Sequence, residues 1–346
     1  MMFIKGMDLS FVDEVEAAGG AYCDGGMRRD PVALMADLGM NAVRLRIWND
    51  PPGGFCNLER TLVMARRIKE RGLHFLLDFH YSDRWADPSN QWKPRAWEGL
   101  DAAGLREAVR RYTADVLSAL AMQGTAPDMV QIGNEVTPGM LWPDGRVDGE
   151  LDTDAQWRTF AGLLQAGASA VRSVCPDAGV MIHIDRGGDW EATRKFFGKM
   201  EELGVDYDVI GQSFYTWWHG TLDDLRRNLA LTAETFGKPI VVVETAYPWT
   251  LEKPDDTGYI LEREDQLAPG YPASVEGQSA YLRDFMRIVR ETPNGLGAGF
   301  YWWEPAWIPA KAMWSVGHHN NWANLTLFDY EGRRLATWDV LREEET

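Results

Sequence analysis

The chain has 346 residues, of which 45% are hydrophobic and 25% charged, and its formal net charge at pH 7 is −17. Binding to nucleic acid or to an anionic membrane needs a basic face, so this acidity argues against both partners. No apolar run reaches the ~18 residues of a membrane-spanning helix, and the first residues, MMFIKGMDLS, do not resemble a signal peptide. We therefore expect a cytoplasmic protein, or a secreted one if the chain has been trimmed.

Short apolar runs alternate with longer helical patterns from one end of the chain to the other. Most of the runs are continuously apolar, which is typical of strands that are covered on both faces. Eight strands are predicted, at residues 3–9, 42–48, 75–81, 129–135, 180–185, 209–215, 240–247 and 297–304.

The segments between these strands carry signals for helices. Asp30 before a proline, Asn57 before an apolar face and Thr221 before a leucine repeat are residues that start helices, and Gly237 is a stop signal for the last of these. Helical spacing of apolar residues also covers 157–174 and 278–290.

Eight strand–helix repeats without a break in composition predict an α/β fold: a (β/α)8 TIM barrel forming a single domain over residues 1–346. An open doubly wound sheet would be expected to carry a glycine-rich, phosphate-binding turn after an early strand, and no such motif is present. The three cysteines are odd in number and scattered, so neither a disulfide framework nor a zinc site is indicated.

A glutamate lies at or near the carboxyl end of the fourth and of the seventh predicted strand. The stretch MVQIGNEV closes with Asn134 and Glu135 on the fourth strand, and IVVVETAY carries Glu244 on the seventh. Because the chemistry of such barrels lies at the strand carboxyl ends, both carboxylates should face one mouth. One glutamate at a strand end is often only a solvated terminus, but this pair indicates function.

A pair of carboxyl groups is what hydrolysis of a glycosidic bond requires. Separations of ~5–5.5 Å allow direct attack with retention of configuration, whereas ~6.5–9.5 Å leaves room for water and gives inversion. Glu135 is the candidate proton donor with a raised pKa, and Asn134 beside it could bind a sugar hydroxyl. Glu244 is the candidate nucleophile and must stay ionised, with Arg44, Arg46 and Tyr215 as its candidate donors.

At these residues the chain resembles glycoside hydrolase family 53, the endo-β-1,4-galactanases (arabinogalactan endo-1,4-β-galactosidases). The similarity runs along almost the whole chain, through FIKGMDLS, VRLRIWNDP, LLDFHYSDRWADPSNQWKPRAW, PDMVQIGNEVTPGMLWP, VVVETAYPWT and FYWWEPAWIP. It implies a barrel, retention of configuration, Glu135 as proton donor and Glu244 as nucleophile. It also implies β-1,4-galactan, or galacto-oligosaccharides derived from it, as the substrate of what we expect to be a monomer.

In one loop the chain departs from the family. Bacterial members often bind calcium after the seventh strand through an Asp-x-Asp-x-His-x-Asn run, whereas residues 250–265 here read TLEKPDDTGYILERED. We therefore expect no cofactor and no metal, with calcium as the alternative. The adjacent His318 and His319 suggest no third ligand, so they too are not expected to bind an ion.

Several further residues are candidates for holding sugar. Sixteen tryptophans are many for this length, and several lie in polar loops where aromatic rings suit sugar faces. Glu304 is expected to pair with an arginine rather than to react. The candidate substrate-binding residues are Arg46, Asp78, His80, Trp85, Asn134, Trp142, Tyr215 and Trp303.

Two other functions stay open on residue patterns alone. A mannanase or cellulase would share the two glutamates, although the axial O4 of galactose needs a differently shaped cleft. A non-catalytic sugar-binding barrel is the second alternative, and the presence of both glutamates argues against it.

Overall fold

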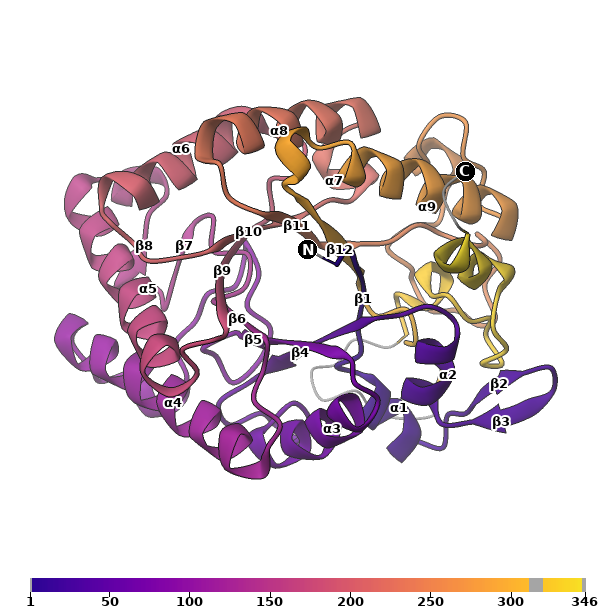
Figure 1. Ribbon diagram of the computed structural model, residues 1–346, viewed down its shortest axis with the longest axis horizontal. Coiled ribbons are helices and arrows are strands. Elements are labelled where there is room, and N and C mark those ends of the chain that lie inside the picture. Colours follow the sequence, from indigo (N-terminus) through magenta and orange to yellow (C-terminus); the bar gives the residue numbers. More distant parts are fainter. Residues whose placement is uncertain (1, 311–319, 344–346) are drawn as a thin grey trace.

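The computed structural model describes residues 2–310 and 320–343, so His318 and His319 lie outside the described residues. Within those ranges, eight parallel strands close into a barrel in the order β1-β12-β11-β10-β9-β6-β5-β4, with helices around it (Figure 1). This confirms the predicted (β/α)8 fold. The barrel strands are β1 (Ile4–Asp8), β4 (Ala42–Ile47), β5 (His74–Phe79), β6 (Met129–Ile132), β9 (Gly179–Ile184), β10 (Val209–Ser213), β11 (Ile240–Thr245) and β12 (Gly297–Trp302).

The predicted helix starts are confirmed by side-chain caps. Asp30 and Asn57 each accept a hydrogen bond from the backbone N–H three residues later, and Thr221 forms a capping box before a helix that ends at Gly237. The helices are α1 (Val12–Ala17), α2 (Pro31–Asp37), α3 (Leu58–Glu70), α4 (Ala102–Gln123), α5 (Asp154–Val174), α6 (Trp190–Glu202), α7 (Thr216–His219), α8 (Leu222–Phe236) and α9 (Val275–Arg290).

Some elements were not predicted. The 22-residue helix α4 is missing from the predicted helices, although Asp101 caps its start and Gly124 ends it in the left-handed region with φ 79°. Two small hairpins in the loops were also missed. They are formed by β2 (Tyr22–Asp24) with β3 (Met27–Arg29), and by β7 (Gly139–Met140) with β8 (Gly145–Arg146).

The core has two layers. A large apolar layer lies between the barrel and the helices, and a smaller cluster fills the barrel interior, where Tyr301 is fully buried. Gly6 makes room for that ring, because a Cβ at this position would lie 2.3 Å from a carbon of Tyr301. The interior is thus apolar at the Tyr301 level, while Arg44, Gln131 and His183 are buried polar residues on the barrel strands.

The predicted strand ends extend one to three residues too far. β6 ends at Ile132 and β12 at Trp302, so Glu135 and Glu304 lie on the following loops. Both glutamates have φ 46°, in the left-handed region that non-glycine residues rarely adopt. Such backbone conformations are frequent at functional sites, where the surrounding structure enforces them.

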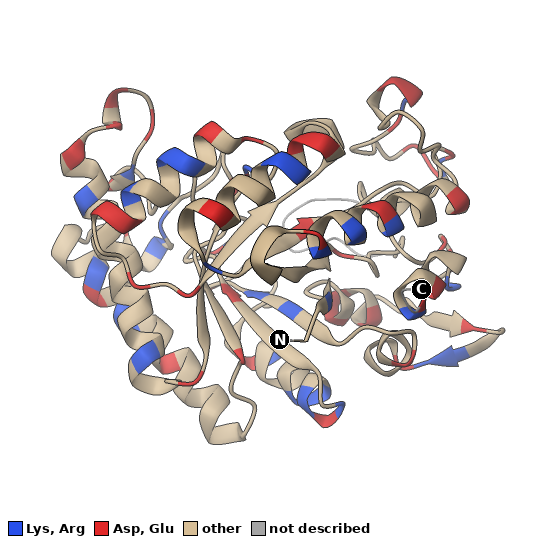
Figure 2. Ribbon diagram, turned by 45° about the horizontal axis from the view of Figure 1, so that its top comes forward, with Lys and Arg blue, Asp and Glu red and all other residues tan. Residues whose placement is uncertain are grey.

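The outer surface mixes both signs of charge. Lys and Arg lie among Asp and Glu along the surrounding helices (Figure 2), as in the pairs of Arg110 with Glu107 and of Arg194 with Glu191. Exposed pairs of this kind contribute only ~0–1 kcal/mol each. Of the helices in residues 2–310 and 320–343, none is both long and apolar enough to cross a membrane.

Candidate active site

A cavity of about 300 Å³ opens where the barrel strands end, and it contains both predicted catalytic glutamates. Its walls combine charged side chains with rings, which is the combination that binds sugars through hydrogen bonds and flat apolar faces. The residues that line it are Asp8, Arg44, Arg46, Asp78, His80, Trp85, Ala86, Asp87, Asn134, Glu135, Tyr215, Trp218, Glu244, Ile260, Trp303, Trp307, Asn321 and Trp322.

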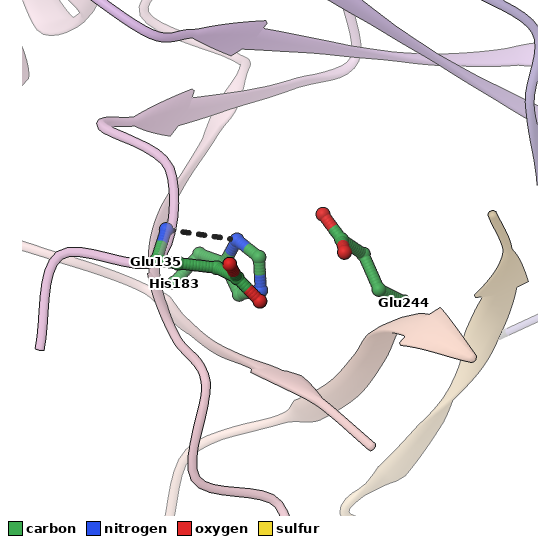
Figure 3. A group of neighbouring side chains, drawn as sticks. All are labelled: Glu135, His183 and Glu244. Carbon is green, nitrogen blue, oxygen red and sulfur yellow. Dashed lines mark hydrogen bonds between the residues drawn. The ribbon is translucent and has the colours of Figure 1, made fainter. Parts of the chain in front are cut away.

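The carboxyl groups of Glu135 and Glu244 face each other across this cavity (Figure 3). Oxygen atoms of the two groups lie within 4.8 Å of each other. This separation agrees with the ~5–5.5 Å of glycosidases that retain configuration and is shorter than the ~6.5–9.5 Å of inverting ones. The geometry therefore suits direct attack by one carboxylate.

Glu244, the last residue but one of β11, is held by two donors. Arg44 Nη1 donates to Oε1 over 2.8 Å, and the Tyr215 hydroxyl donates to Oε2 over 3.1 Å. Burial raises the pKa of the Glu244 carboxyl to about 7, with Arg44 opposing the rise and the nearby Asp8 carboxylate adding to it. Both donors stabilise the ionised form, as a nucleophile requires.

Glu135 has a different environment. Its Oε1 accepts a 2.6 Å hydrogen bond from the Ser213 hydroxyl. Burial, together with the charges of Glu244 and Asp185, holds the Glu135 pKa well above its usual range, and the Ser213 bond opposes that rise. No arginine or lysine pairs with Glu135 within the described residues, whereas Glu244 has Arg44. The pair is therefore arranged so that Glu135 keeps a proton while Glu244 loses one.

A single buried arginine links the ionised groups of the site. Arg44 on β4 forms salt bridges with Asp8 at 3.0 Å, Asp78 at 2.8 Å and Glu244 at 2.8 Å, and it donates to Asn134 over 2.7 Å. Burial acts to lower the Arg44 pKa, but these carboxylates outweigh it and raise the pKa above its usual range, so the guanidinium stays charged. It therefore fixes the orientation of the nucleophile relative to two neighbouring strands.

The sequence model of glycosyl hydrolase family 53 matches residues 4–341. The chain belongs to this family. Relatives include a Niallia circulans protein described as an uncharacterized protein in the bgaB 5′ region, 62% identical over 99% of this chain and 95% of the relative. An arabinogalactan endo-beta-1,4-galactanase of Cellvibrio japonicus is 37% identical over 94% of this chain and 86% of its own. The solved Ignisphaera aggregans GH53 catalytic domain superposes with a TM-score of 0.92 at 39% identity, covering 98% of this chain and 95% of that one.

In this family 53 barrel, seven of the eight candidate substrate-binding residues line the cavity with the glutamates, and Trp142 does not. Trp142 lies in another hollow, against Trp92, with ring centroids 5.5 Å apart. The candidates in the cavity are Arg46, Asp78, His80, Trp85, Asn134, Tyr215 and Trp303.

The polar candidates are already bonded to the protein. Asn134 Nδ2 donates to the Ala86 carbonyl over 2.7 Å, which uses one of its two amide hydrogens. His80 Nδ1 accepts from Trp48 Nε1, and its Nε2 lies 3.1 Å from Asp78. These bonds fix the side chains in one orientation toward the cavity before any ligand arrives.

Arg46 has a structural partner as well. It forms a buried salt bridge with Glu304 at 2.6 Å, which confirms that Glu304 pairs with an arginine. The guanidinium also lies over the rings of Phe11 and Trp85, 4.2 and 4.3 Å from their centroids. Arg46 therefore does not bind Glu244, and of the two predicted arginines only Arg44 does so.

Sequence reasoning missed several polar residues of this site, among them Asp8, His183 and Ser213. Asp8 ends the first strand, while His183 and Ser213 lie on the fifth and sixth barrel strands. Each interrupts an apolar run near its carboxyl end, which is the same signal that marked Glu135 and Glu244. Applied to every strand, it would have found them.

Glu135, His183 and Glu244 also form a group whose ligand atoms could surround a metal ion. Both imidazole nitrogens are already engaged, however: Nε2 lies 2.8 Å from Ser213 Oγ, and Nδ1 lies 3.0 Å from Gln131 Nε2. Because a ligating imidazole must offer a free lone pair, this grouping fits hydrogen bonding better than metal coordination.

The loop that departs from the family's calcium pattern is held by ion pairs. Lys253 contacts Glu262 at 2.5 Å, and Glu262 also accepts from the backbone of Tyr259 over 2.6 Å. Asp255 accepts from the N–H of Thr257 over 2.8 Å, within its own turn. Lys253 thus supplies a positive charge within this loop.

Proposed function

We propose that this family 53 hydrolase is a retaining endo-β-1,4-galactanase that acts on galactan, arabinogalactan type I or derived galacto-oligosaccharides. The observation that carries the proposal is the pair Glu135 and Glu244, with oxygens within 4.8 Å and with Arg44 beside Glu244 only. The substrate class rests on family membership and on the galactanase relative described above.

In the first step, Glu135 donates its proton to the glycosidic oxygen while a Glu244 oxygen attacks the anomeric carbon. The bond to the leaving sugar breaks, and a covalent glycosyl–enzyme ester forms with inverted configuration. Arg44 and Tyr215 keep Glu244 ionised and oriented until it attacks. Burial, together with the charges of Glu244 and Asp185, raises the Glu135 pKa well above its usual range, which favours the protonated form that a proton donor needs.

In the second step, the Glu135 carboxylate removes a proton from a water molecule, which attacks the anomeric carbon and displaces Glu244. This second inversion restores the original configuration, and Glu135 is protonated again. The rings of Trp85, Trp303 and Trp322 line the cavity around these carboxylates and offer faces for the sugar.

The deciding experiment is incubation with β-1,4-galactan, mannan and cellulose, followed by identification of the products. We expect galacto-oligosaccharides from galactan alone, with the β-configuration of the new reducing end seen by NMR before it equilibrates. Cleavage of mannan or cellulose instead would support the alternative clan activities. Glu244→Gln should abolish turnover and leave oligosaccharide binding intact; a wild-type chain that binds but never cleaves would be a sugar-binding protein.

A further inference from the structure

Two buried polar side chains behind Glu135 take no part in the reaction as described. His183 on β9 and Ser213 on β10 are both fully buried. Ser213 Oγ lies 2.6 Å from Glu135 Oε1 and 2.8 Å from His183 Nε2. The three side chains thus form a chain of hydrogen bonds that ends on the candidate proton donor, with His183 beside Glu135 in Figure 3.

The neighbours of His183 Nδ1 determine the direction of this chain. Two donors point at Nδ1: the backbone N–H of Glu135 at 3.3 Å and Gln131 Nε2 at 3.0 Å. The Gln131 amide cannot be reversed, because its Oε1 accepts from Arg44 and its Nε2 donates to Asp78. The Asn134 carbonyl oxygen is also 3.0 Å from Nδ1, but the backbone N–H of Glu135 has a fixed direction and donates to Nδ1, so this nitrogen is the acceptor.

With Nδ1 as an acceptor, the neutral imidazole carries its hydrogen on Nε2. That hydrogen is donated to Ser213 Oγ, so the serine hydroxyl must donate its own hydrogen onward to Glu135 Oε1. In a carboxylic acid the carbonyl oxygen is a better acceptor than the protonated oxygen, so this bond favours the acidic proton on Oε2. Within the part of the chain that the structure describes, Oε2 has no hydrogen-bond partner.

We propose that His183 and Ser213 are positioning residues that reserve Oε1 of Glu135 as an acceptor and so confine the acidic proton to Oε2, facing the glycosidic oxygen. This inference rests on the proposed function. In the second step the same serine hydroxyl stabilises the Glu135 carboxylate while it acts as a base. One fixed chain of hydrogen bonds then serves both protonation states of Glu135.

Other charged groups face the same residues and set the background for a pH test. Glu135 is faced by the carboxylates of Glu244 on β11, Asp185 after β9 and Asp87 in the loop after β5. His183 is faced by Arg44, His80 and His219, which with burial keep its pKa well below the usual range and so keep it neutral. None of these groups is altered by a change at Ser213.

The test compares Ser213→Ala with the wild type on two substrates. Galactan has a poor leaving group and needs the proton, whereas a dinitrophenyl β-galactobioside has a leaving group that departs without one. We expect kcat/KM on galactan to fall about 10- to 100-fold, part of the ~10²–10⁴-fold that a positioned general acid supplies. The value of kcat/KM on the aryl substrate should stay within about twofold of the wild-type value. This parameter reports the formation of the glycosyl–enzyme, which needs no proton when the leaving group is dinitrophenol.

The pH profile gives a second readout. The Ser213 bond favours ionised Glu135, so its loss should raise the Glu135 pKa and move the basic limb of kcat/KM on galactan upward by about one unit. Ser213→Thr keeps a hydroxyl. This variant should therefore keep the wild-type ratio of kcat/KM on galactan to kcat/KM on the aryl substrate, and the wild-type position of the basic limb. Ser279→Ala, which removes a buried hydroxyl from α9, is the matched control for loss of a serine hydrogen bond.

Equal losses of kcat/KM on both substrates, or a basic limb that is unmoved or lower, would overturn the inference and leave Ser213 a structural residue. If Ser213→Ala does not fold, as judged by circular dichroism, Ser213→Cys replaces it, and the same substrate ratio decides. A wild-type chain that cleaves neither substrate would refute the proposed function instead, so the two failures are distinguishable.

Discussion

Tyr215→Phe removes one of the two hydrogen bonds that hold Glu244 and leaves the ring in place. The hydroxyl donates to Glu244 Oε2 over 3.1 Å in a fully buried setting, while Arg44 continues to hold Oε1. Because the lost donor favoured the charged carboxylate, the Glu244 pKa should rise. The acidic limb of kcat/KM, which reports ionisation of the free nucleophile, should therefore move to higher pH.

The size of the shift follows from the strength of the bond. A hydrogen bond to a charged group contributes about 1.5–3 kcal/mol, and one pKa unit corresponds to about 1.36 kcal/mol, so the limb should move by about one to two units. Starting from a Glu244 pKa of about 7, roughly a tenth of the wild type is ionised at pH 6. At pH 6, the fraction of the variant with ionised Glu244 should be ~10- to 100-fold smaller than that of the wild type.

The assay is kcat/KM on galactan from pH 4 to pH 10 for the wild type, Tyr215→Phe and Tyr112→Phe. Tyr112 on α4 donates to the carbonyl of Trp48 and serves as the control for losing a tyrosine hydroxyl elsewhere. The control should keep the wild-type limb. If Tyr215→Phe lowers activity equally at every pH, or moves the limb downward, the tyrosine does not stabilise the ionised nucleophile and the assignment of Glu244 fails.

Three other predictions test the remaining parts of the site. Glu135→Gln should lower galactan hydrolysis by ~10²–10⁴-fold while a dinitrophenyl galactobioside still forms the glycosyl–enzyme, seen as a burst of dinitrophenol; loss of that burst would argue against the proton-donor role. Dialysis against EDTA should leave both activity and the thermal unfolding midpoint unchanged, and a fall that calcium restores would show that the loop after β11 needs a metal. Trp218→Ala should raise KM for long galacto-oligosaccharides more than for galactobiose, because this ring is 57% exposed at the cavity and an aromatic face binds further sugar units; equal KM changes would exclude that role.

The barrel could be predicted from the sequence because its signals are local. Each strand is a continuous apolar run, and helix starts such as Asp30, Asn57 and Thr221 make their bonds within one turn. The strand ends were less accurate, since Glu135 and Glu304 closely follow apolar runs in sequence but, with their left-handed backbone, lie outside the strands in space. That backbone conformation is imposed by packing, which a pattern of residue types does not record.

From the sequence, single residues of the site could be recognised, but the contacts between them could not. Glu135 and Glu244 stand out at strand ends, and parallel strands bring them to one mouth. Which arginine holds the nucleophile depends on contacts between strands that lie far apart in sequence: Arg44 and Glu244 are 200 residues apart. Arg44 and Arg46 are equivalent on the pattern alone, and only the fold pairs one with Glu244 and the other with Glu304.

The arrangement around Arg44 explains why two glutamates in one cavity can take opposite roles. One guanidinium faces the carboxylates of Asp8, Asp78 and Glu244, so the positive charge is shared rather than devoted to the nucleophile. Burial then brings the Glu244 pKa to about 7 instead of well below its usual range. Burial and the charge of Glu244 hold the Glu135 pKa well above its usual range, and within the described residues no Lys or Arg pairs with it. Ionisation of Glu244 thus raises the proton affinity of Glu135, and the Arg44 guanidinium beside Glu244 places the negative charge of the pair on the nucleophile.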